Sequence, residues 1–566
     1  MHSGTRVADH LVRAVSTLGV RHLFGVGGAN IEDLYDAAFD HRHLITAVVA
    51  KHEFAAATMA DGYARSTSGL GVVCATSGGG AMNLVAGLAE SFASRVPVLA
   101  LIGQPPTVLE GKGAFQDTSG QAGSFDAVAL FTPISRYCAR VEAPADLPAH
   151  LTRAVTAAYR GGPAVLLLPK DIQQADLVAS DFVPPTRAYR REIENLWRVL
   201  HLVRAARATG KVVLIAGDQV ARDDARAELA RFAALLDAAV GVAPDAKDVY
   251  HHADPGFCGV SGSMGHPELI DALRGAALCV LVGTRLPVTA SAGLDDALRE
   301  LPLVSIGDAP PFPSAVHAHT NDLARTLDEL SSEWHTTTGE STAAVIPLRP
   351  HRAAPTALPV PPADGPGLRY REVVETINNG LPDGADVFAD AGNTGAAAVH
   401  HLRLPRAGRF TVALGMGGMG YAFGAGIGSA FARHRRPDGS TRHTFVIAGD
   451  GAFFMHGMEI HTAVEHELPI TFIVLNNNAH AMCVTREQQY YGNRYSFNRF
   501  RPAYPGAGMA VMFPELCVHT PCSTAELAAA LRHCVGDPGP SLIAIDCDPD
   551  EIPPFTPFLT APRRQP

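Results

Sequence analysis

The sequence predicts an α/β protein of three doubly wound domains, each built on a parallel sheet with helices on both faces. The chain has 566 residues, which corresponds to about three or four domains of about 150 residues each. Short apolar runs alternate with amphipathic segments from one end to the other. This alternation is typical of parallel strands that are buried on both faces and connected by helices.

Two segments rich in proline and polar residues divide the chain into three parts of similar size. The first is PPTRAYRR at 184–191, and the second extends from about Glu340 to Gly367. Domain boundaries usually fall in segments of this kind. We therefore expect an N-terminal domain at 1–183, a central domain at 190–340 and a C-terminal domain at 365–566.

The expected strands are the apolar runs, and Ala-rich segments such as 52–65 and 83–94 are the helices between them. In the N-terminal domain the runs are HLFGV (22–26), GVVCAT (71–76), VPVLALIG (96–103) and PAVLLLP (163–169). The central domain has KVVLIAGD (211–218), LCVLVGT (278–284) and LVSIGD (303–308). The C-terminal domain has DVFAD (386–390), HTFVIAGDG (443–451), ITFIVLNN (470–477) and SLIAIDCD (541–548).

Composition argues against several classes of function. The net charge is −10, so an acidic surface would be repelled by a phosphate backbone and no nucleic acid partner is expected. The chain does not open on a basic stretch followed by an apolar run, and no apolar run reaches about 18 residues, so we expect a cytoplasmic protein without a membrane span. The nine cysteines are scattered, and Cys517 and Cys522 do not form a metal-ligand pattern, so we expect reduced thiols.

The segment from Phe445 to Met482 predicts a site for a metal ion and a phosphorylated ligand. An expected strand ends at the GDG of 449–451, a single amphipathic helix with Ile460, Val464 and Leu468 on one face follows, and the next strand ends at the asparagine pair 476–477. Both strand ends lie at the carboxyl edge of the sheet, where α/β proteins bind ligands.

The residue types at this edge suit Mg²⁺ and a diphosphate. The carboxylate of Asp450, the amide oxygen of Asn477 and a backbone carbonyl near Ala479 are oxygen ligands of the kind that Mg²⁺ takes. Gly449 and Gly451 let backbone N–H groups approach phosphates at a helix start. The alternative is a tight turn with Asp450 as a helix cap, which does not require the later asparagine pair.

This GDG…NN pattern resembles the thiamine diphosphate motif of the acetolactate synthase, pyruvate oxidase and 2-oxo acid decarboxylase superfamily. The resemblance implies that Asp450, Asn477 and the Ala479 carbonyl hold Mg²⁺. It also places further residues beside the cofactor, and these are Gly449, Gly451, Ala452, His480, Ala481 and Met482. Ala452 stands where many relatives carry serine.

A glycine-rich segment at 413–428, ALGMGGMGYAFGAGIG, allows two interpretations. Its GxGxxG pattern would indicate dinucleotide binding, but a suitable acidic residue about twenty positions later is not evident. It better resembles the family's glycine-rich stretch, in which Met419, beside Gly417 and Gly418, would be the apolar wedge that bends the cofactor. Ordinary core packing is the alternative for Met419.

Two further motifs resemble the two ends of the cofactor site. DAGNTG at 390–395 resembles the diphosphate loop, with Gly392, Asn393 and Thr394 as donors. KHEFAAATMADGYAR at 51–65 closely resembles the family's activating helix. There Glu53 would contact the aminopyrimidine, favour its imino tautomer and so promote loss of the thiazolium proton. A solvated helix glutamate is the alternative for Glu53.

Other segments of the N-terminal domain resemble the family's pyrimidine side. TSGGGAMN (76–83) and FGVGG (24–28) each carry glycine, Gly79 and Gly27, where relatives usually have proline. The contacts implied by these segments come from Gly27, Gly28, Thr76, Gly79 and Asn83. Phe115 and Gln116 match a Phe-Gln pair whose glutamine reaches the reacting centre, although a solvated loop is the alternative.

The resemblance implies an enzyme that decarboxylates a 2-oxo acid and ligates the resulting carbanion to a carbonyl acceptor. One alternative is a decarboxylase that releases an aldehyde, and another, from a different class, is a catalytically silent cofactor-binding scaffold. The intact Glu53, Asp450 and Asn477 argue against the scaffold. His480 is a candidate proton donor, or else a structural histidine. Arg486 stands where acetolactate synthases carry a tryptophan, so it is a candidate for holding an anionic substrate, or else a solvated arginine.

Several features leave the substrate and partners open. VGTRLPVT around Arg285 lacks the Asp-Arg pair of true acetolactate synthases, which puts condensation of two pyruvates in doubt. The His-His pair that many simple decarboxylases carry near the N-terminus is not apparent, and His400-His401 is expected at the surface. No segment indicates FAD. The family's glutamate-bearing and metal-bearing domains meet across a subunit interface, which implies a homodimer or homotetramer.

Overall fold

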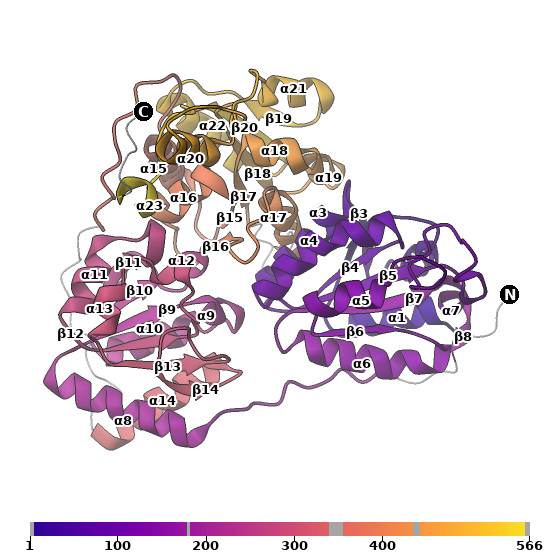
Figure 1. Ribbon diagram of the computed structural model, residues 1–566, viewed down its shortest axis with the longest axis horizontal. Coiled ribbons are helices and arrows are strands. Elements are labelled where there is room, and N and C mark those ends of the chain that lie inside the picture. The colour runs from indigo at the N-terminus through magenta and orange to yellow at the C-terminus, as the bar shows by residue number, and fades with distance from the viewer. Residues whose placement is uncertain (1–4, 178–181, 339–354, 434–441, 561–566) are drawn as a thin grey trace.

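The computed structural model describes residues 5–177, 182–338, 355–433 and 442–560. Three six-stranded sheets, each with all its strands parallel, form three domains whose sheets are covered by helices (Figure 1). The predicted fold class is therefore confirmed. In the described part of the chain, no helix has the length and apolarity needed to cross a membrane.

The N-terminal sheet has the strand order β3-β2-β4-β5-β7-β6. Its strands are β2 (His22–Gly25), β3 (Thr46–Val49), β4 (Gly71–Ala75), β5 (Val98–Gln104), β6 (Tyr137–Arg140) and β7 (Pro163–Pro169). Its helices are α1 (Val7–Thr17), α2 (Glu32–Asp40), α3 (Glu53–Thr67), α4 (Gly79–Ala93), α5 (Ala127–Phe131), α6 (Leu147–Ala158) and α7 (Lys170–Gln174). Short 3-10 helices are η1 (Thr107–Leu109), η2 (Thr132–Ile134) and η3 (Pro144–Asp146). A small antiparallel pair, β1 (Thr5–Arg6) with β8 (Asp176–Leu177), joins the two ends of this domain.

The C-terminal sheet, β16-β15-β17-β18-β20-β19, repeats the connectivity of the N-terminal sheet strand for strand. Its strands are β15 (Asp386–Ala389), β16 (Arg409–Val412), β17 (Thr444–Gly449), β18 (Ile470–Asn476), β19 (Cys517–His519) and β20 (Ser541–Asp546). Its helices are α15 (Tyr370–Gly380), α16 (Gly392–His401), α17 (Tyr421–Arg433), α18 (Asp450–His456), η6 (Gly457–Glu459), α19 (Ile460–Glu465), α20 (Ala481–Tyr491), α21 (Pro505–Met512), α22 (Thr524–Gly536) and α23 (Thr556–Thr560).

The central sheet has a different order, β11-β10-β9-β12-β13-β14, which is the order of dinucleotide-binding domains. Its strands are β9 (Lys211–Ala216), β10 (Ala239–Val242), β11 (Phe257–Val260), β12 (Ala276–Val282), β13 (Leu303–Gly307) and β14 (Val316–His319). Its helices are α8 (Ile193–Thr209), α9 (Asp218–Arg222), α10 (Arg226–Leu235), η4 (Pro244–Ala246), η5 (Gly262–Met264), α11 (Pro267–Arg274), α12 (Val288–Ser291), α13 (Asp295–Arg299) and α14 (Leu323–Thr338).

Helices α3 and α17 pack against each other and join the N-terminal domain to the C-terminal domain (Figure 1). Glycines make this close approach possible, because a Cβ at Gly62 would lie 2.0 Å from the Ala425 carbonyl oxygen. A Cβ at Gly428 would lie equally close to the carbonyl oxygen of Met59. The apolar core around these helices is continuous across the two domains.

The connection between β17 and β18 differs from the prediction of one amphipathic helix. The structure has three short pieces there, α18, η6 and α19, and Leu468 lies beyond the end of α19. The break is at His456, whose φ of −137° and ψ of 11° are not helical, whereas Gly457 after it has helical dihedrals. Apolar periodicity alone does not reveal such a break.

Candidate active site

The carboxyl edge of the C-terminal sheet brings Asp450 and Asn477 together, as expected. Asp450 follows the last residue of β17, and Asn477 follows the last residue of the neighbouring strand β18. The Asn477 N–H lies 3.5 Å from Oδ1 of Asp450. Both side chains are buried, at 1% and 8% exposure.

The carboxylate of Asp450 is buried and lacks a full set of hydrogen-bond partners, as expected of a group that binds a cation. Burial raises the pKa of its carboxyl to about 6. Its Oδ2 is buried without a hydrogen-bond partner among the described residues, and so is Oδ1 of Asn393, another residue predicted at this site. Buried oxygens left unpaired are costly unless a ligand satisfies them. These oxygens therefore fit Mg²⁺ and a polar cofactor group.

The side chain of Asn477 is held by hydrogen bonds on both sides of its amide. Its Nδ2 donates a 2.9 Å hydrogen bond to the hydroxyl of Tyr370, a buried residue of α15. Its Oδ1 accepts a 3.0 Å hydrogen bond from the N–H of Ala479. Tyr370 was not predicted from the sequence, and it fixes which amide atom faces the site.

The predicted diphosphate loop forms the N-terminus of α16. Gly392 has φ of +81°, a conformation that favours glycine. Asn393 and Thr394 are buried in the first turn, and the Thr394 hydroxyl oxygen lies 3.4 Å from a Cβ placed at Gly449. Free N–H groups of this ten-residue helix thus face the same edge as the GDG turn.

Met419 and His480 both lie against the GDG turn. A Cβ at Gly451 would lie 3.0 Å from Met419 Cε and 2.5 Å from His480 Cδ2. His480 is half-buried, and its ring packs edge-on against Phe500 with centroids 4.8 Å apart. Packing therefore requires glycine at position 451. Gly451, Met419 and His480, all predicted at the site, lie in contact there.

Two buried carboxylates that the sequence analysis missed hold the glycine-rich loop at both ends. Glu90, on α4 of the N-terminal domain, accepts hydrogen bonds from the N–H groups of Gly415, Met416 and Gly417, at 3.1, 2.6 and 3.2 Å. Asp390 accepts 2.9 Å hydrogen bonds from the N–H groups of Gly420 and Ala422. Burial raises the pKa of Asp390. Gly418 and Met419 lie between these two anchors, and Gly417 is itself held by Glu90.

Glu53 begins α3 and is nearly buried, at 8% exposure. Asn83 donates a 2.9 Å hydrogen bond from Nδ2 to its Oε2. Its Oε1 lies 3.1 Å from a Cβ placed at Gly80. His52 caps the helix by accepting the Phe54 N–H at Nδ1. Glu53 is thus held in one position, unlike an ordinary surface glutamate.

The turns around Glu53 bring other predicted residues together. The Thr76 hydroxyl donates a 3.1 Å hydrogen bond to Oε1 of Gln116, and a Cβ at Gly28 would lie 2.6 Å from Thr76 Cβ. Gln116 has φ of +59°. A cavity of about 530 Å³ adjoins it and is lined in part by Gly79. Phe115 is 76% exposed, and nothing lies within 4 Å of a Cβ placed at Gly27.

The start of α3 contacts the C-terminal domain beside the glycine-rich loop. The His456 ring stacks on Phe54 with centroids 4.4 Å apart, and a Cβ at Gly418 would lie 3.5 Å from Phe54 Cζ. The Lys51 N–H donates to both carboxylate oxygens of Glu459 at 3.1 Å. Burial lowers the pKa of His456 to about 4, and the neighbouring His52 acts in the same direction.

Four predicted residues lie further from these contacts. Arg486 is exposed on α20. Met482 is half-buried and packs against the core, and Ala481 is buried at the start of the same helix. Ala452 is buried in the first turn of α18.

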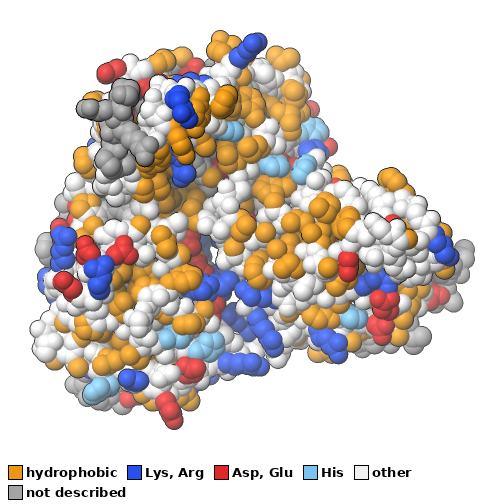
Figure 2. Space-filling model, in the orientation of Figure 1, with side chains coloured by type: hydrophobic (Ala, Val, Ile, Leu, Met, Phe, Trp, Pro, Cys, Tyr) orange, Lys and Arg blue, Asp and Glu red, His pale blue; other side chains and the backbone are white. Residues whose placement is uncertain are grey.

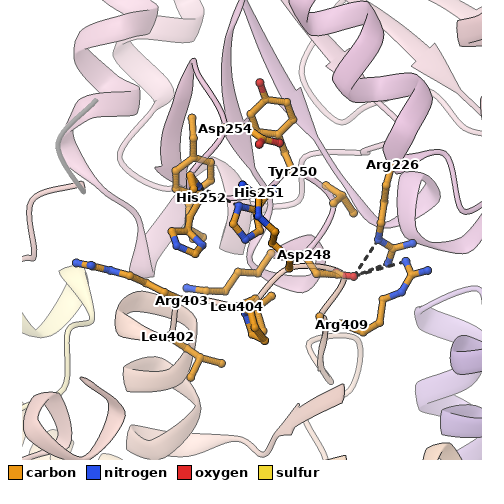
Figure 3. A pocket seen from close by; sticks show the side chains of 18 of the residues that line it. Arg226, Asp248, Tyr250, His251, His252, Asp254, Leu402, Arg403, Leu404 and Arg409 are labelled. Atoms are coloured by element: carbon orange, nitrogen blue, oxygen red, sulfur yellow. Dashed lines mark hydrogen bonds and ion pairs between the residues drawn. The ribbon is translucent and has the colours of Figure 1, made fainter. Parts of the chain in front are cut away.

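A separate cavity of about 1080 Å³ lies between the central and C-terminal domains (Figure 3). Arg226, Asp248 and Arg403 line it, and Arg226 pairs with Asp248. His400, expected at the surface, is instead 3% exposed beside this cavity and stacks on His266 of the central domain at 4.4 Å. The two domains meet there, which is why His400 is buried, and His401 beside it is half-buried. No predicted site residue lines this cavity.

Arginine and aspartate side chains occupy the carboxyl edge of the central sheet. Asp218 follows β9 closely, and Asp308 follows β13 directly. Arg95 of the N-terminal domain bridges them, with contacts of 2.7 and 2.6 Å, and Arg222 contacts both as well. This ionic network joins the N-terminal domain to the carboxyl edge of the central sheet, which is the edge at which sheets of this order bind nucleotides.

Comparison with known proteins shows similarity along most of the chain. Residues 5–124, 198–321 and 390–545 match the N-terminal TPP binding domain, the central domain and the C-terminal TPP binding domain of the thiamine pyrophosphate enzyme family. The acetolactate synthase large subunit of Corynebacterium glutamicum is 27% identical, covering 87% of this chain and 78% of that protein. The acetolactate synthase large subunit of Haemophilus influenzae is 25% identical over 90% of each chain.

Solved structures have the same fold. Benzoylformate decarboxylase from Polynucleobacter necessarius aligns with a TM-score of 0.81 at 18% identity, covering 97% of this chain and 99% of that one. A thiamin diphosphate-dependent enzyme from Mycobacterium smegmatis aligns with a TM-score of 0.79 at 22% identity, covering 96% and 99%.

Proposed function

The chain belongs to the thiamine pyrophosphate enzymes, and we propose that it decarboxylates a 2-oxo acid and ligates the remaining carbon unit to a carbonyl acceptor. The proposal rests on one observation, the combination of Asp450 and Asn477 at one sheet edge with a fixed, buried Glu53 in the other cofactor-type domain. The named relatives are acetolactate synthases, which favours ligation over simple decarboxylation.

The C-terminal domain would hold the charged end of the cofactor. Asp450, Asn477 and the carbonyl of Ala479 would bind Mg²⁺, because they are hard oxygen ligands and Asp450 has an unpaired buried oxygen. The N–H groups at the GDG turn and at the start of α16 would bind the diphosphate. When bound, thiamine diphosphate supplies the electron sink for the electrons that remain as CO₂ leaves.

Residues of this chain would position groups and move protons around that cofactor. Glu53 would take and return a proton at Oε1 while Asn83 holds Oε2. Met419 would exclude water from the space beside Gly451 and His480. His480 is the candidate donor that protonates a leaving or newly formed oxygen, and Gln116 would orient the substrate from the Thr76 side.

The arginines considered for substrate binding are exposed. Arg285 is exposed, and its guanidinium lies over the Phe312 ring at 4.4 Å. Arg486 is exposed on α20. We assign Arg486 as the candidate for holding an anionic substrate, since arginine binds carboxylates through two parallel hydrogen bonds.

We also propose that a second copy of this chain covers the exposed apolar surface around the site, in a homodimer or homotetramer. Phe115, next to Gln116, and Met416, next to Gly417, are 76% and 62% exposed. Phe454 and Met455 of α18 are 52% and 49% exposed. Figure 2 shows hydrophobic side chains gathered over one face of the N-terminal domain. Apolar patches of this kind usually mark interfaces.

A reaction survey tests this function. The purified protein is reconstituted with thiamine diphosphate and Mg²⁺ and offered pyruvate and other 2-oxo acids, with and without aldehyde or ketone acceptors. CO₂ together with a condensed hydroxyketone is the expected result. CO₂ with only an aldehyde would replace the proposal by a simple decarboxylase. Tight cofactor binding without turnover would favour a silent scaffold.

Asp450→Asn tests the metal site. It should lose Mg²⁺-dependent turnover while keeping the fold, because it removes a buried charge whose Oδ2 has no hydrogen-bond partner in the described structure. Sedimentation velocity at micromolar concentration tests the assembly, and a monomer with full activity would contradict the proposed interface.

A further inference from the structure

The outer edge of the C-terminal sheet carries three metal-binding side chains at one point. Cys517 and His519 are the first and last residues of the edge strand β19, and His533 lies in the last turn of α22. Cys517 and His519 are half-buried and His533 is exposed. The three side chains come from β19 and α22, and their ligand atoms lie close together although the two elements are separate in the sequence.

The distances among the three ligand atoms are those of a tetrahedral zinc site. The Cys517 sulfur lies 3.4 Å from Nε2 of His519 and 3.7 Å from Nδ1 of His533. The two nitrogens are 3.3 Å apart. Tetrahedral ligands at about 2.3 Å for Zn–S and about 2.0–2.1 Å for Zn–N lie about 3.5 Å apart for sulfur and nitrogen, and about 3.3 Å apart for two nitrogens. One ion can therefore lie within bonding distance of all three atoms.

The chemistry of the donors selects the metal. A thiolate with two imidazoles suits Zn²⁺ and other borderline or soft divalent ions, whereas Mg²⁺ takes oxygen ligands. This donor set differs from the oxygen ligands of Asp450 and Asn477. We propose that Cys517, His519 and His533 bind one Zn²⁺ ion, with water in the fourth position.

The topology separates this site from the cofactor edge. Cys517 pairs with Ser541 at the start of β20, whereas the cofactor residues follow the ends of β17 and β18. A bound ion would link the three-residue edge strand to α22 and so restrain an otherwise weakly held edge. On binding, the Cys517 thiol loses its proton to solvent and forms the sulfur–metal bond.

Cobalt substitution tests the site in the intact holoenzyme. The protein, loaded with thiamine diphosphate and Mg²⁺, is titrated with Co²⁺ and then with Zn²⁺ as competitor. One equivalent of Co²⁺ per chain should give the thiolate-to-cobalt charge-transfer band of a four-coordinate site, and Zn²⁺ should abolish it. An oxygen-only site does not produce that band, so binding near Asp450 is distinguishable.

Variants identify the ligands. Cys517→Ser should remove the charge-transfer band, and His533→Ala should weaken Co²⁺ binding by at least about tenfold. Cys522→Ser is the matched control, since Cys522 is an exposed cysteine five residues away, and it should behave as wild type. A band that persists in Cys517→Ser, or Zn²⁺ uptake equal in wild type and in that variant, would overturn the proposal. Turnover is not the readout, so the outcome is independent of the proposed reaction.

Discussion

Asn83 donates a 2.9 Å hydrogen bond to Oε2 of Glu53 and joins the N-terminal halves of α3 and α4. The bond fixes one carboxylate oxygen, and the other lies beside Gly80. A proton-transferring group needs such restraint, because its geometry has to match the atom that it serves.

Glu53→Gln should retain thiamine diphosphate but lower kcat by about 10²–10⁴-fold, the usual contribution of a general acid–base group. Asn83→Ala should lower kcat by about tenfold, because it removes one hydrogen bond to the carboxylate. Cofactor affinity by calorimetry, kcat and exchange of the cofactor's C2 proton are measured for each variant. Exchange at the wild-type rate in Glu53→Gln would remove Glu53 from this role.

Glu90→Gln should loosen the glycine-rich loop. The substitution replaces one acceptor of three backbone N–H groups by an amide donor inside a buried contact, at a cost of about 1–3 kcal/mol. We expect a lower Tm and a cofactor Kd raised by about tenfold. Glu515→Gln, at an exposed position, is the control. Equal cofactor affinity in both variants would show that the loop is held by other contacts.

Gly451→Ala should disturb the point at which Met419 and His480 meet. The added Cβ would lie 2.5 Å from the His480 ring, which Phe500 holds from another side. Overpacking of this kind costs about 1–3 kcal/mol, so the cofactor Kd should rise by about tenfold. Gly508→Ala places its Cβ in open space and should be neutral. An unchanged cofactor Kd in Gly451→Ala would mean that the turn at 449–451 shifts to accommodate the added methyl group.

His456 should make the contact between the N- and C-terminal domains sensitive to acid. Burial lowers its pKa from 6.5 to about 4, so between these values the unfolded chain binds more protons than the folded chain and stability falls as pH falls. His456→Phe keeps a ring against Phe54 and removes the titration. Thermal unfolding from pH 7 to pH 4 should show a smaller loss of Tm in this variant than in wild type.

The matched control for this prediction is His201→Phe, at a position exposed on α8. It should follow the wild-type dependence on pH. If Tm falls with pH equally in wild type and in His456→Phe, other histidines cause the acid sensitivity.

Local patterns were sufficient to predict the fold class and the pair Asp450 and Asn477. Buried parallel strands are short apolar runs, and the residues that follow neighbouring strands meet at one edge regardless of the chain between them. The same reasoning predicted a single helix after β17, which was wrong, because non-helical dihedrals at His456 interrupt the helix.

The sequence by itself determined the residues next to the predicted cofactor, since strand, turn and helix start are adjacent in the chain. Tertiary structure alone decided what holds them. Glu90 contacts the loop at Gly415 across a sequence separation of 325 residues, and His533 of a helix contacts Cys517 of an edge strand. The path of the folded chain sets these contacts, and they follow no repeating spacing in the sequence. The sequence around Glu90 or His533 therefore does not indicate which residue each one contacts.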